Sequence, residues 1–486
     1  MNHIEHKIPA LASSLLAIDF EFYREMISEN KSRNENMNQL LEKTKNISVE
    51  YLESLKNRRV YPDKETISQL KMFTESLPEK PTSAEEVIEY LNKFGSPSAV
   101  ASAGGRYFGF VIGGSVPASL AANWLAGTWD QNGGLSVTSP VNVAIEKVTS
   151  DWLVEILPVA KEATAGFVTG VTMANFCGLA AARHSILKKF NWNVEADGLF
   201  NAPEIKVVIG EEAHGSLLKA LNLIGFGYKR VIKVPVDDQG RMIADHIPEL
   251  DDKTIVCLQA GNVNSGSFDP ADKIIPLAKQ KGAWVHVDGA FGLWAGVSEK
   301  YSYLTKGIEK ADSWATDGHK WLNVPYDSGI VIVKDAENLR AAMSMTGDYL
   351  DQSGERVPYQ YTPELSRKAR AIEIWAAIKS LGRSGIVDLI ERTCSHASRF
   401  ARELKDAGYQ ILNDVVINQV LVSFGSDEST KKVVEEIQKA GTCWMGLTNW
   451  RGKTAMRISV SSWATTEDDV EKSLEAIIQI ANKYSK

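Results

Sequence analysis

Two residues of opposite charge stand at the ends of two apolar segments in the middle of the chain. Asp288 follows residues 283–287, and Lys320 lies 32 residues after it, just beyond residues 313–316. A lysine can form a Schiff base with an aldehyde, and a carboxylate can keep a basic ring nitrogen protonated. We therefore expect the pair to bind an aldehyde cofactor whose protonated ring accepts electrons.

A small turn between a predicted strand and a predicted helix is a candidate for holding a phosphate group. Gly170, Val171 and Thr172 join residues 166–169 to the helical segment 174–189. Backbone N–H groups and the helix dipole attract an anion at such a helix start. An ordinary helix cap formed by Thr172 is the alternative interpretation.

Two other segments that follow predicted strands could touch a ligand. His214 comes shortly after residues 205–209, where its ring can lie flat against a planar group. A structural or surface histidine is the alternative. The loop 261–270 is rich in Asn and Gly, which suits a tight loop in contact with a ligand.

These residues depend on the elements around them, and residues 140–335 alternate between helical and strand-like segments. The strand-like segments are short and nearly all apolar, and they cover residues 166–169, 205–209, 230–234, 255–259, 283–287, 313–316 and 329–333. Such strands, separated by helices, are typical of a mostly parallel sheet buried on both faces. We therefore predict an α/β fold, with ligands at the carboxyl ends of the strands. Residues 365–382 are predicted to form one helix, and 385–486 a smaller α+β unit.

Composition argues against several classes of protein. The 486 residues include 54 basic and 61 acidic side chains and no basic block, which argues against nucleic acid or a membrane as partner. No two of the four cysteines have metal-ligand or redox spacing, so we expect reduced thiols, no metal site and a cytoplasmic location. The first 20 residues do not have the pattern of a signal peptide.

One uncharged segment, residues 107–129, is long enough to cross a membrane. Several glycines, Pro117 and Asn123 interrupt it, and Asp130 follows directly. We therefore expect a buried segment of a soluble protein, covered by another domain or another subunit.

Taken in order, these motifs resemble those of the group II pyridoxal-phosphate-dependent amino acid decarboxylases, which include the aromatic-L-amino-acid and glutamate decarboxylases. The resemblance covers about residues 45–485. It is strongest at the phosphate turn, at Ala213-His214, in the loop 261–269, at His286-Val287-Asp288-Gly289-Ala290 and at His319-Lys320-Trp321. The family has the aspartate-aminotransferase-type fold (fold type I), so the resemblance implies a mostly parallel central sheet and a smaller C-terminal α+β domain.

The resemblance also implies a role for each site residue. Lys320 would carry pyridoxal 5'-phosphate as a Schiff base, Asp288 would pair with the ring nitrogen, and His214 would stack on the ring. Gly170, Val171 and Thr172 would hold the phosphate, and Ala290 and His319 would lie beside the cofactor. Tyr349, 29 residues after Lys320, would be the loop tyrosine that returns a proton after carbon dioxide leaves. A half-buried loop tyrosine without this role is the alternative.

The resemblance implies three regions and a homodimer with shared active sites. Residues 1–104 would form an N-terminal helical segment that packs in the dimer, 105–364 the large cofactor-binding domain, and 365–486 the small domain. The molecule that binds in the site would be a small-molecule amino acid substrate.

Three departures from the family pattern leave the substrate open. Arg106 precedes Tyr107-Phe108, where aromatic-substrate members carry a His-Pro segment; it could meet a second substrate carboxylate or form a structural ion pair. Asp130 could bind a cationic group of the substrate. Asp317 replaces an Asn near the phosphate and would repel it unless the carboxylate turns away or is bonded. Aromatic, acidic and diamino substrates all remain open.

The reaction that we expect is decarboxylation of an L-amino acid to the amine and carbon dioxide. A pyridoxal-phosphate-dependent aminotransferase, an aldolase-type lyase or a decarboxylating aldehyde synthase could use the same residues, and so could a catalytically silent homologue.

Overall fold

The computed structural model of the chain describes residues 36–344 and 356–484. The chain forms two compact units, with the boundary between Val100 and Ala101. The described part of the first unit is mainly helical, as the sequence predicts. It contains a long helix over residues 36–54, α2 (Lys64–Ser68), η1 (Gln69–Phe73), α3 (Ala84–Tyr90), η2 (Leu91–Gly95) and α4 (Ser96–Ser98). The three predicted regions, with bounds at 104 and 364, stay a prediction.

The second unit is built on a seven-stranded sheet with the order β1-β7-β6-β5-β4-β2-β3. Its strands are β1 (Thr164–Val168), β2 (Lys206–Gly210), β3 (Ile232–Val234), β4 (Thr254–Gln259), β5 (Trp284–Asp288), β6 (Ser313–Asp317) and β7 (Gly329–Val333). Neighbouring strands from β6 to β3 are parallel, and β7 runs antiparallel to both β1 and β6. The α/β fold and the mostly parallel sheet are therefore confirmed.

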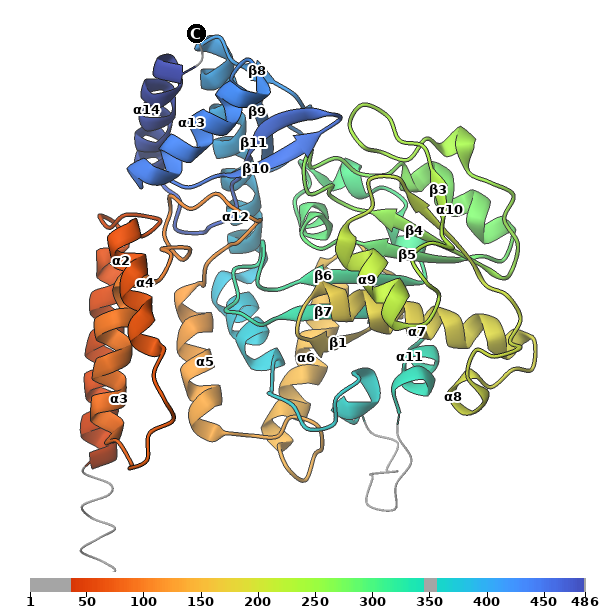
Figure 1. Cartoon of the computed structure of the whole chain (residues 1–486). Helices are drawn as coiled ribbons and strands as arrows, with labels where there is room; N and C mark the ends of the chain where they lie inside the picture. The colour runs from red at the N-terminus through yellow and green to blue at the C-terminus, as the bar shows by residue number, and fades with distance from the viewer. Residues whose placement is uncertain (1–35, 345–355, 485–486) are drawn as a thin grey trace, which may run out of the picture. The chain divides into compact units, whose positions relative to one another are not determined.

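The sheet is buried on both faces, each of which packs in a hydrophobic core. Successive side chains of a strand point to opposite sides and therefore belong to different cores. Val207, Ile209 and Cys257 pack with α7 (Val171–Lys189) on one face, whereas Val208 and Val256 belong to the core on the other. Figure 1 shows α7 running across the sheet in the second unit. The same alternation along β5 places His286 and Asp288 on the α7 face, where both contact Asn175.

Several helices cover or connect the strands of this sheet. They are α5 (Pro117–Trp129), α6 (Pro140–Ile156), α8 (Val194–Asp197), α9 (Gly215–Leu223), α10 (Ala271–Gln280) and α11 (Ala336–Met343). One-turn helices are η3 (Ala244–His246), η4 (Gly292–Val297), η5 (Ser302–Thr305), η6 (Ile308–Lys310) and η7 (Pro358–Tyr361).

A long helix leads into a smaller antiparallel sheet. The prediction of one helix over residues 365–382 is wrong at its start and right at its end, because α12 begins at Ala371 and is broken at Gly382 before it continues to Asp406. Gly382 has a φ of 61°, which a glycine adopts at little cost. The sheet has the order β10-β11-β9-β8 and confirms the predicted α+β unit. Its elements are β8 (Gln410–Ile411), β9 (Gln419–Ser423), α13 (Asp427–Ala440), β10 (Gly446–Trp450), β11 (Lys453–Ser459) and α14 (Glu467–Tyr484).

The uncharged segment 107–129 has two parts. Tyr107, Phe108 and Val116 are buried within the chain, whereas Trp124 and Trp129 of α5 are 44% and 43% exposed. The residues that the structure describes therefore cover only part of the segment. No helix within the described ranges is both long and apolar enough to span a membrane.

Candidate active site

The end of β6 and the turn after it position Lys320. The Lys320 Nζ lies 3.0 Å from the Asp317 Oδ2, and the lysine side chain is only 17% exposed. The next residue, Trp321, is buried and donates a hydrogen bond from its Nε1 to the Thr393 Oγ1 on α12 at 2.9 Å. The buried indole anchors the turn, so the direction of the lysine is set by packing rather than by the turn alone.

Asp288 ends the neighbouring parallel strand, β5. Its Oδ2 accepts a hydrogen bond from the Asn175 Nδ2 at 2.9 Å, and its Oδ1 accepts one from the Ala290 N–H at 3.3 Å. The side chain is 4% exposed. Because β5 and β6 pair in parallel, their carboxyl ends, and with them Asp288 and Lys320, open at the same edge of the sheet.

His214 shares a small cavity with Asp288 at this edge. The cavity is lined by residues from the ends of β2, β4 and β5, from α9 and from the loops beside them, namely Gly210, Glu212, Ala213, His214, Leu217, Gly240, Cys257, Leu258, Gln259, Asp269 and Asp288. The His214 Nδ1 accepts a hydrogen bond from the Ser216 N–H at 3.2 Å at the start of α9. Desolvation lowers the pKa of His214, and the charge of Asp288 opposes this shift. The structure thus brings these two predicted site residues to one cavity, and their roles stay predictions.

The predicted phosphate turn forms the start of α7. Gly170 is the N-cap and Val171 the first helical residue, so Thr172 lies inside the helix and is not its cap. A Cβ on Gly170 would lie 3.3 Å from the His319 Cε1 and 3.6 Å from the Asp317 Oδ1. The start of α7 thus lies close to the turn that carries Lys320, and Gly170, which has no side chain, fits between them.

Asp317 is bonded rather than turned away from this helix start. Its Oδ1 accepts a hydrogen bond from the Val171 N–H at 2.6 Å, and its side chain is 1% exposed. One carboxylate thus contacts both the phosphate turn and Lys320. The sequence left open whether the Asp317 carboxylate turns away from the phosphate turn or is hydrogen-bonded there, and in the structure it is hydrogen-bonded.

His319 lies beside Lys320 and packs against an aromatic ring. Its Nδ1 accepts a hydrogen bond from the Ser328 N–H at 3.1 Å, and its ring stacks on Tyr326 with a centroid distance of 4.2 Å. Burial lowers the pKa of His319, whose side chain is 11% exposed, whereas Tyr326 is 58% exposed. The His319 ring is therefore uncharged near neutral pH.

The structure adds residues that sequence reasoning missed. Asn175 is fully buried on α7 and holds Asp288, and the only sequence signal for it is an amide in a mostly apolar helix. Arg457 on β11 donates a hydrogen bond from its Nη1 to the Asn264 Oδ1 at 3.2 Å, and burial lowers its pKa. Its charge helps to lower the pKa of His214, so the small domain brings a cation to the same neighbourhood.

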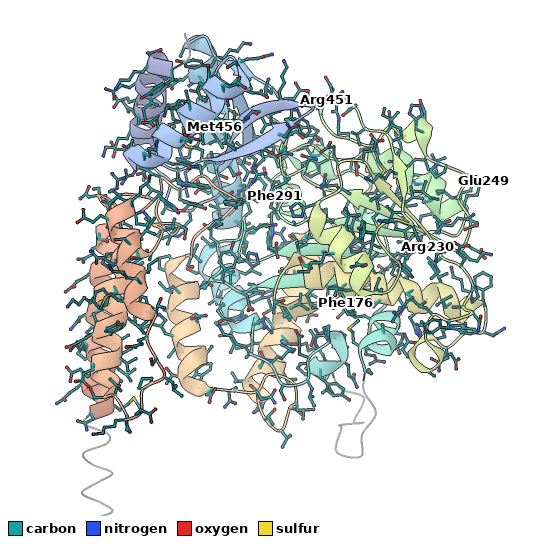
Figure 2. The ribbon with its side chains drawn as sticks, viewed as in Figure 1. Phe176, Arg230, Glu249, Phe291, Arg451 and Met456 are labelled. Atoms are coloured by element: carbon teal, nitrogen blue, oxygen red, sulfur yellow. The ribbon has the colours of Figure 1, made fainter. Side chains whose placement is uncertain are left out.

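The β10–β11 hairpin carries this contact. Figure 2 shows Arg451 at its tip and Met456 further along β11. Arg451 donates a hydrogen bond to the Asp237 carbonyl at 2.7 Å, and Thr448 donates one to the Asn264 Oδ1 at 2.9 Å. The hairpin is thereby tied to loops of the large sheet.

Of the other predicted residues, Ala290 lies between Asp288 and β6, because its carbonyl accepts the Asp317 N–H at 2.9 Å. Tyr349 lies outside the described residues, so its role stays a prediction.

The side chains fit pyridoxal 5'-phosphate. A lysine and a buried carboxylate occupy neighbouring strand ends, and a helix, α7, starts beside them at Gly170. The lysine suits the aldehyde, the carboxylate suits the ring nitrogen, and the helix start suits the phosphate. Fold and site thus define a pyridoxal-phosphate-dependent enzyme of fold type I.

Comparison with known proteins narrows the class. The sequence matches the pyridoxal-dependent decarboxylase conserved domain over residues 67–425, and the chain belongs to this family. The family resemblance, the cofactor and the class of enzyme, an amino acid decarboxylase, are therefore confirmed.

The relatives by sequence differ in the substrates that their names state. The chain is 26% identical over 474 residues to an aromatic-L-amino-acid decarboxylase of Bacillus atrophaeus, covering 93% of this chain and 96% of that one. It is 26% identical over 399 residues to an L-2,4-diaminobutyrate decarboxylase of Acinetobacter baumannii, covering 75% and 76%. It is 28% identical over 343 residues to an acidic amino acid decarboxylase of Xenopus tropicalis, covering 68% and 65%.

Solved structures support the fold. The TDC of Oryza sativa with PLP and tryptamine superposes with a TM-score of 0.85 at 20% identity, covering 93% of this chain and 99% of that one. Mouse CSAD superposes with a TM-score of 0.83 at 20% identity, covering 92% and 98%. The predicted fold type is confirmed.

Proposed function

We propose that the protein decarboxylates an L-amino acid to the corresponding amine, with Lys320 as the residue that binds the cofactor covalently. The observation that carries this proposal is the common sheet edge at which Lys320, Asp288 and the start of α7 meet. When bound, pyridoxal phosphate supplies an aldehyde carbon for an amine and a ring that accepts electrons. The residues around it have to bind, orient and move protons.

Asp288 is the residue that we assign to the ring nitrogen. Two N–H donors fix the direction of this carboxylate, and a carboxylate favours a protonated nitrogen opposite it. His214 lines the same cavity and limits the position of a planar group. Val171 and Thr172 at the helix start, together with Gly170, are assigned to the phosphate.

Proton return to the substrate α-carbon is assigned to Tyr349. This assignment rests on the sequence resemblance, and it favours simple decarboxylation over transamination, side-chain cleavage and aldehyde formation. His319 and Tyr326 stack beside Lys320 and limit the space available to the substrate.

The substrate class stays open. Arg106 is 8% exposed, donates a hydrogen bond from its Nη1 to the Thr442 carbonyl at 2.5 Å and lies 3.7 Å from the Asp469 Oδ1. These contacts support the structural ion pair over a contact with an acidic substrate. Arg457 is the half-buried cation that we assign to an anionic group in the site.

We also propose a homodimer with shared sites and a cytoplasmic location. Exposed tryptophans on α5 support a dimer, because the single chain leaves Trp124 and Trp129 in contact with water. The four cysteines are free and buried, which suits a reducing compartment.

Two measurements test the proposed function. Borohydride reduction of the holoenzyme followed by peptide mapping should place the cofactor on Lys320, and a Lys320→Ala variant should not be labelled. Carbon dioxide and amine should then be measured over a panel of aromatic, acidic and diamino acids. Labelling of a different lysine would overturn the covalent assignment, and aldehyde or keto-acid products without amine would indicate one of the alternative reactions.

A further inference from the structure

Three buried polar side chains continue inward from Asp288, away from the cavity that it lines. The Asn175 Nδ2 donates to the Asp288 Oδ2 at 2.9 Å, and the His286 Nε2 lies 2.9 Å from the Asn175 Oδ1. The His286 Nδ1 lies 2.8 Å from the Ser313 Oγ. Asn175, His286 and Ser313 are each 0% exposed.

Donor and acceptor chemistry determines the position of every proton in this row. An ionised Asp288 can only accept, so Asn175 presents its NH2 group to it and its carbonyl oxygen to His286. That oxygen can only accept, so His286 carries its proton on Nε2. The neutral ring then accepts at Nδ1, and the Ser313 hydroxyl donates to it.

The row also has a defined inner end. The Trp284 Nε1–H donates to the Ser313 Oγ at 2.9 Å, and an indole N–H can only donate. The serine oxygen therefore accepts from the indole while its own proton goes to His286. Each polar group in the row has a partner, and the protons all point in one direction, from Trp284 toward Asp288.

The fold builds this row by close packing of α7 on the sheet. His286 and Asp288 are two residues apart on β5 and point to the same face, and His286 pairs in register with Ser313 on β6. A Cβ at position 178 of α7 would lie 2.8 Å from the His286 Cε1, so Gly178 is what allows the helix to come this near.

The charge state of His286 agrees with the proton order. Burial lowers the pKa of His286 to about 4, so the ring is neutral near pH 7. Only a neutral ring can accept at Nδ1 and donate at Nε2 at the same time.

We propose that Asn175, His286 and Ser313 form a proton-ordered relay that holds the Asp288 carboxylate in the orientation needed by the cofactor ring nitrogen. The three are positioning residues, since they act through Asp288. The inference rests on the proposed role of Asp288. A carboxylate that loses a buried N–H donor is less stable as an anion, so breaking the relay should weaken the contact with the ring nitrogen.

The relay can be tested by cofactor binding, without reference to turnover. Dissociation constants for pyridoxal phosphate should be measured for the full chain and for Asn175→Ala, His286→Gln and Ser313→Ala. We expect Asn175→Ala to weaken binding by about tenfold or more and Ser313→Ala by a smaller factor, because a hydrogen bond to a charged group contributes more than one between neutral groups. The bound-cofactor absorption bands should interconvert at higher pH in Asn175→Ala and Ser313→Ala than in the parent protein, because a less protonated ring raises the pKa of the Schiff-base nitrogen that these bands report.

Ser150→Ala is the matched control. Ser150 is also buried, and its Oγ accepts a hydrogen bond from the Ala165 N–H of β1 at 2.9 Å, away from the relay. It loses the same hydroxyl group, and we expect its cofactor affinity and absorption bands to match those of the parent protein. If Ser150→Ala changed them as much as Ser313→Ala does, the effect would be general loss of packing and the relay would be refuted.

Two further measurements separate the relay from the role of Asp288. Nitrogen NMR of labelled histidine identifies the His286 ring as the signal that disappears in His286→Gln. That signal should be the signal of a neutral ring with its proton on Nε2; a charged ring or the other tautomer would overturn the relay. Asp288→Asn should lose most of the cofactor affinity. If it does not, the proposed role of Asp288 is wrong; if it does while Asn175→Ala and Ser313→Ala bind normally, only the relay is wrong.

Discussion

The Asp317 Oδ1 accepts a hydrogen bond from the Val171 N–H at 2.6 Å, at the helix start that we assign to the cofactor phosphate. The same carboxylate lies 3.0 Å from the Lys320 Nζ through its Oδ2. The buried Asp317 carboxylate therefore already accepts one N–H group of the phosphate turn, and it also forms an ion pair with Lys320. The phosphate must bind beside this negative charge.

Asp317→Asn should therefore bind pyridoxal phosphate more tightly. The amide keeps an oxygen for the Val171 N–H but removes one negative charge, and we expect a gain of about tenfold, equal to ~1.4 kcal/mol. The gain should shrink as the salt concentration rises, if part of the repulsion passes through solvent. Equilibrium dialysis against the cofactor at two salt concentrations measures both effects.

Asp312→Asn provides the control for this change in charge. Asp312 precedes β6 at its opposite end, where it lies 2.6 Å from the Lys279 Nζ and accepts the Val285 N–H at 2.8 Å. It should leave cofactor affinity unchanged. Weaker binding by Asp317→Asn would show instead that the carboxylate supports the site through Lys320.

His286 should make the stability of the fold depend on pH in acid. Its pKa in the folded chain is about 4, below the usual value of 6.5, because burial disfavours the charged ring. The unfolded chain thus binds more protons between pH 6.5 and 4, and the stability contributed by the neutral ring is lost as the pH falls through this window. The loss should be about 3 kcal/mol at most.

The difference between the parent protein and His286→Gln isolates this effect. Asp269, whose pKa burial raises to about 6, acts in the opposite direction in part of the same range, but it is present in both proteins. Urea unfolding of the cofactor-free chains at several pH values should show that the stability advantage of the parent narrows in acid. An equal slope in both proteins, or the same narrowing in a variant of the exposed His246, would contradict the assignment.

Tyr349→Phe should slow formation of the amine. A positioned general acid contributes about 100-fold or more to proton transfer, so we expect a loss of that size in amine formation. Cofactor affinity should stay unchanged. Amine, aldehyde and carbon dioxide should be measured separately, with Tyr228→Phe, an exposed tyrosine, as the control. Unchanged amine formation would remove Tyr349 from the reaction.

Trp124→Glu should weaken the proposed dimer. Trp124 is 44% exposed on α5, and a charge in an apolar interface loses hydration without gaining a partner. Sedimentation of the holoenzyme should show a shift toward monomer at micromolar concentration. Phe200→Glu is the control, because Phe200 is 91% exposed in a loop. A parent protein that sediments as a monomer, or a Trp124→Glu variant that stays as dimeric as the control, would contradict this interface.

Local sequence was enough to locate the strands and the main chemical groups. Apolar segments such as 255–259 and 329–333 coincide closely with β4 and β7, because a strand buried on both faces rarely carries charges along its length. Asp288 and Lys320 were recognisable because each interrupts or follows such a segment. The parallel order of most strands followed from the helices between them.

The partners of these groups could not be predicted from the sequence. Asn175 and Asp288 are 113 residues apart, and Val171 and Asp317 are 146 apart, so neither contact leaves a local pattern. The reversed direction of β7 and the continuation of α12 beyond Gly382 likewise follow from packing.

The sequence by itself thus determined which chemistry is possible: a lysine, a carboxylate and a phosphate turn at the ends of buried strands. Only the tertiary structure decided how that chemistry is controlled, by placing Asn175 and His286 behind Asp288 and by directing the Asp317 carboxylate at the phosphate turn. The physical reason is that residue type and spacing set local structure, whereas charge and proton position depend on neighbours that only the packing of α7 against the sheet brings together.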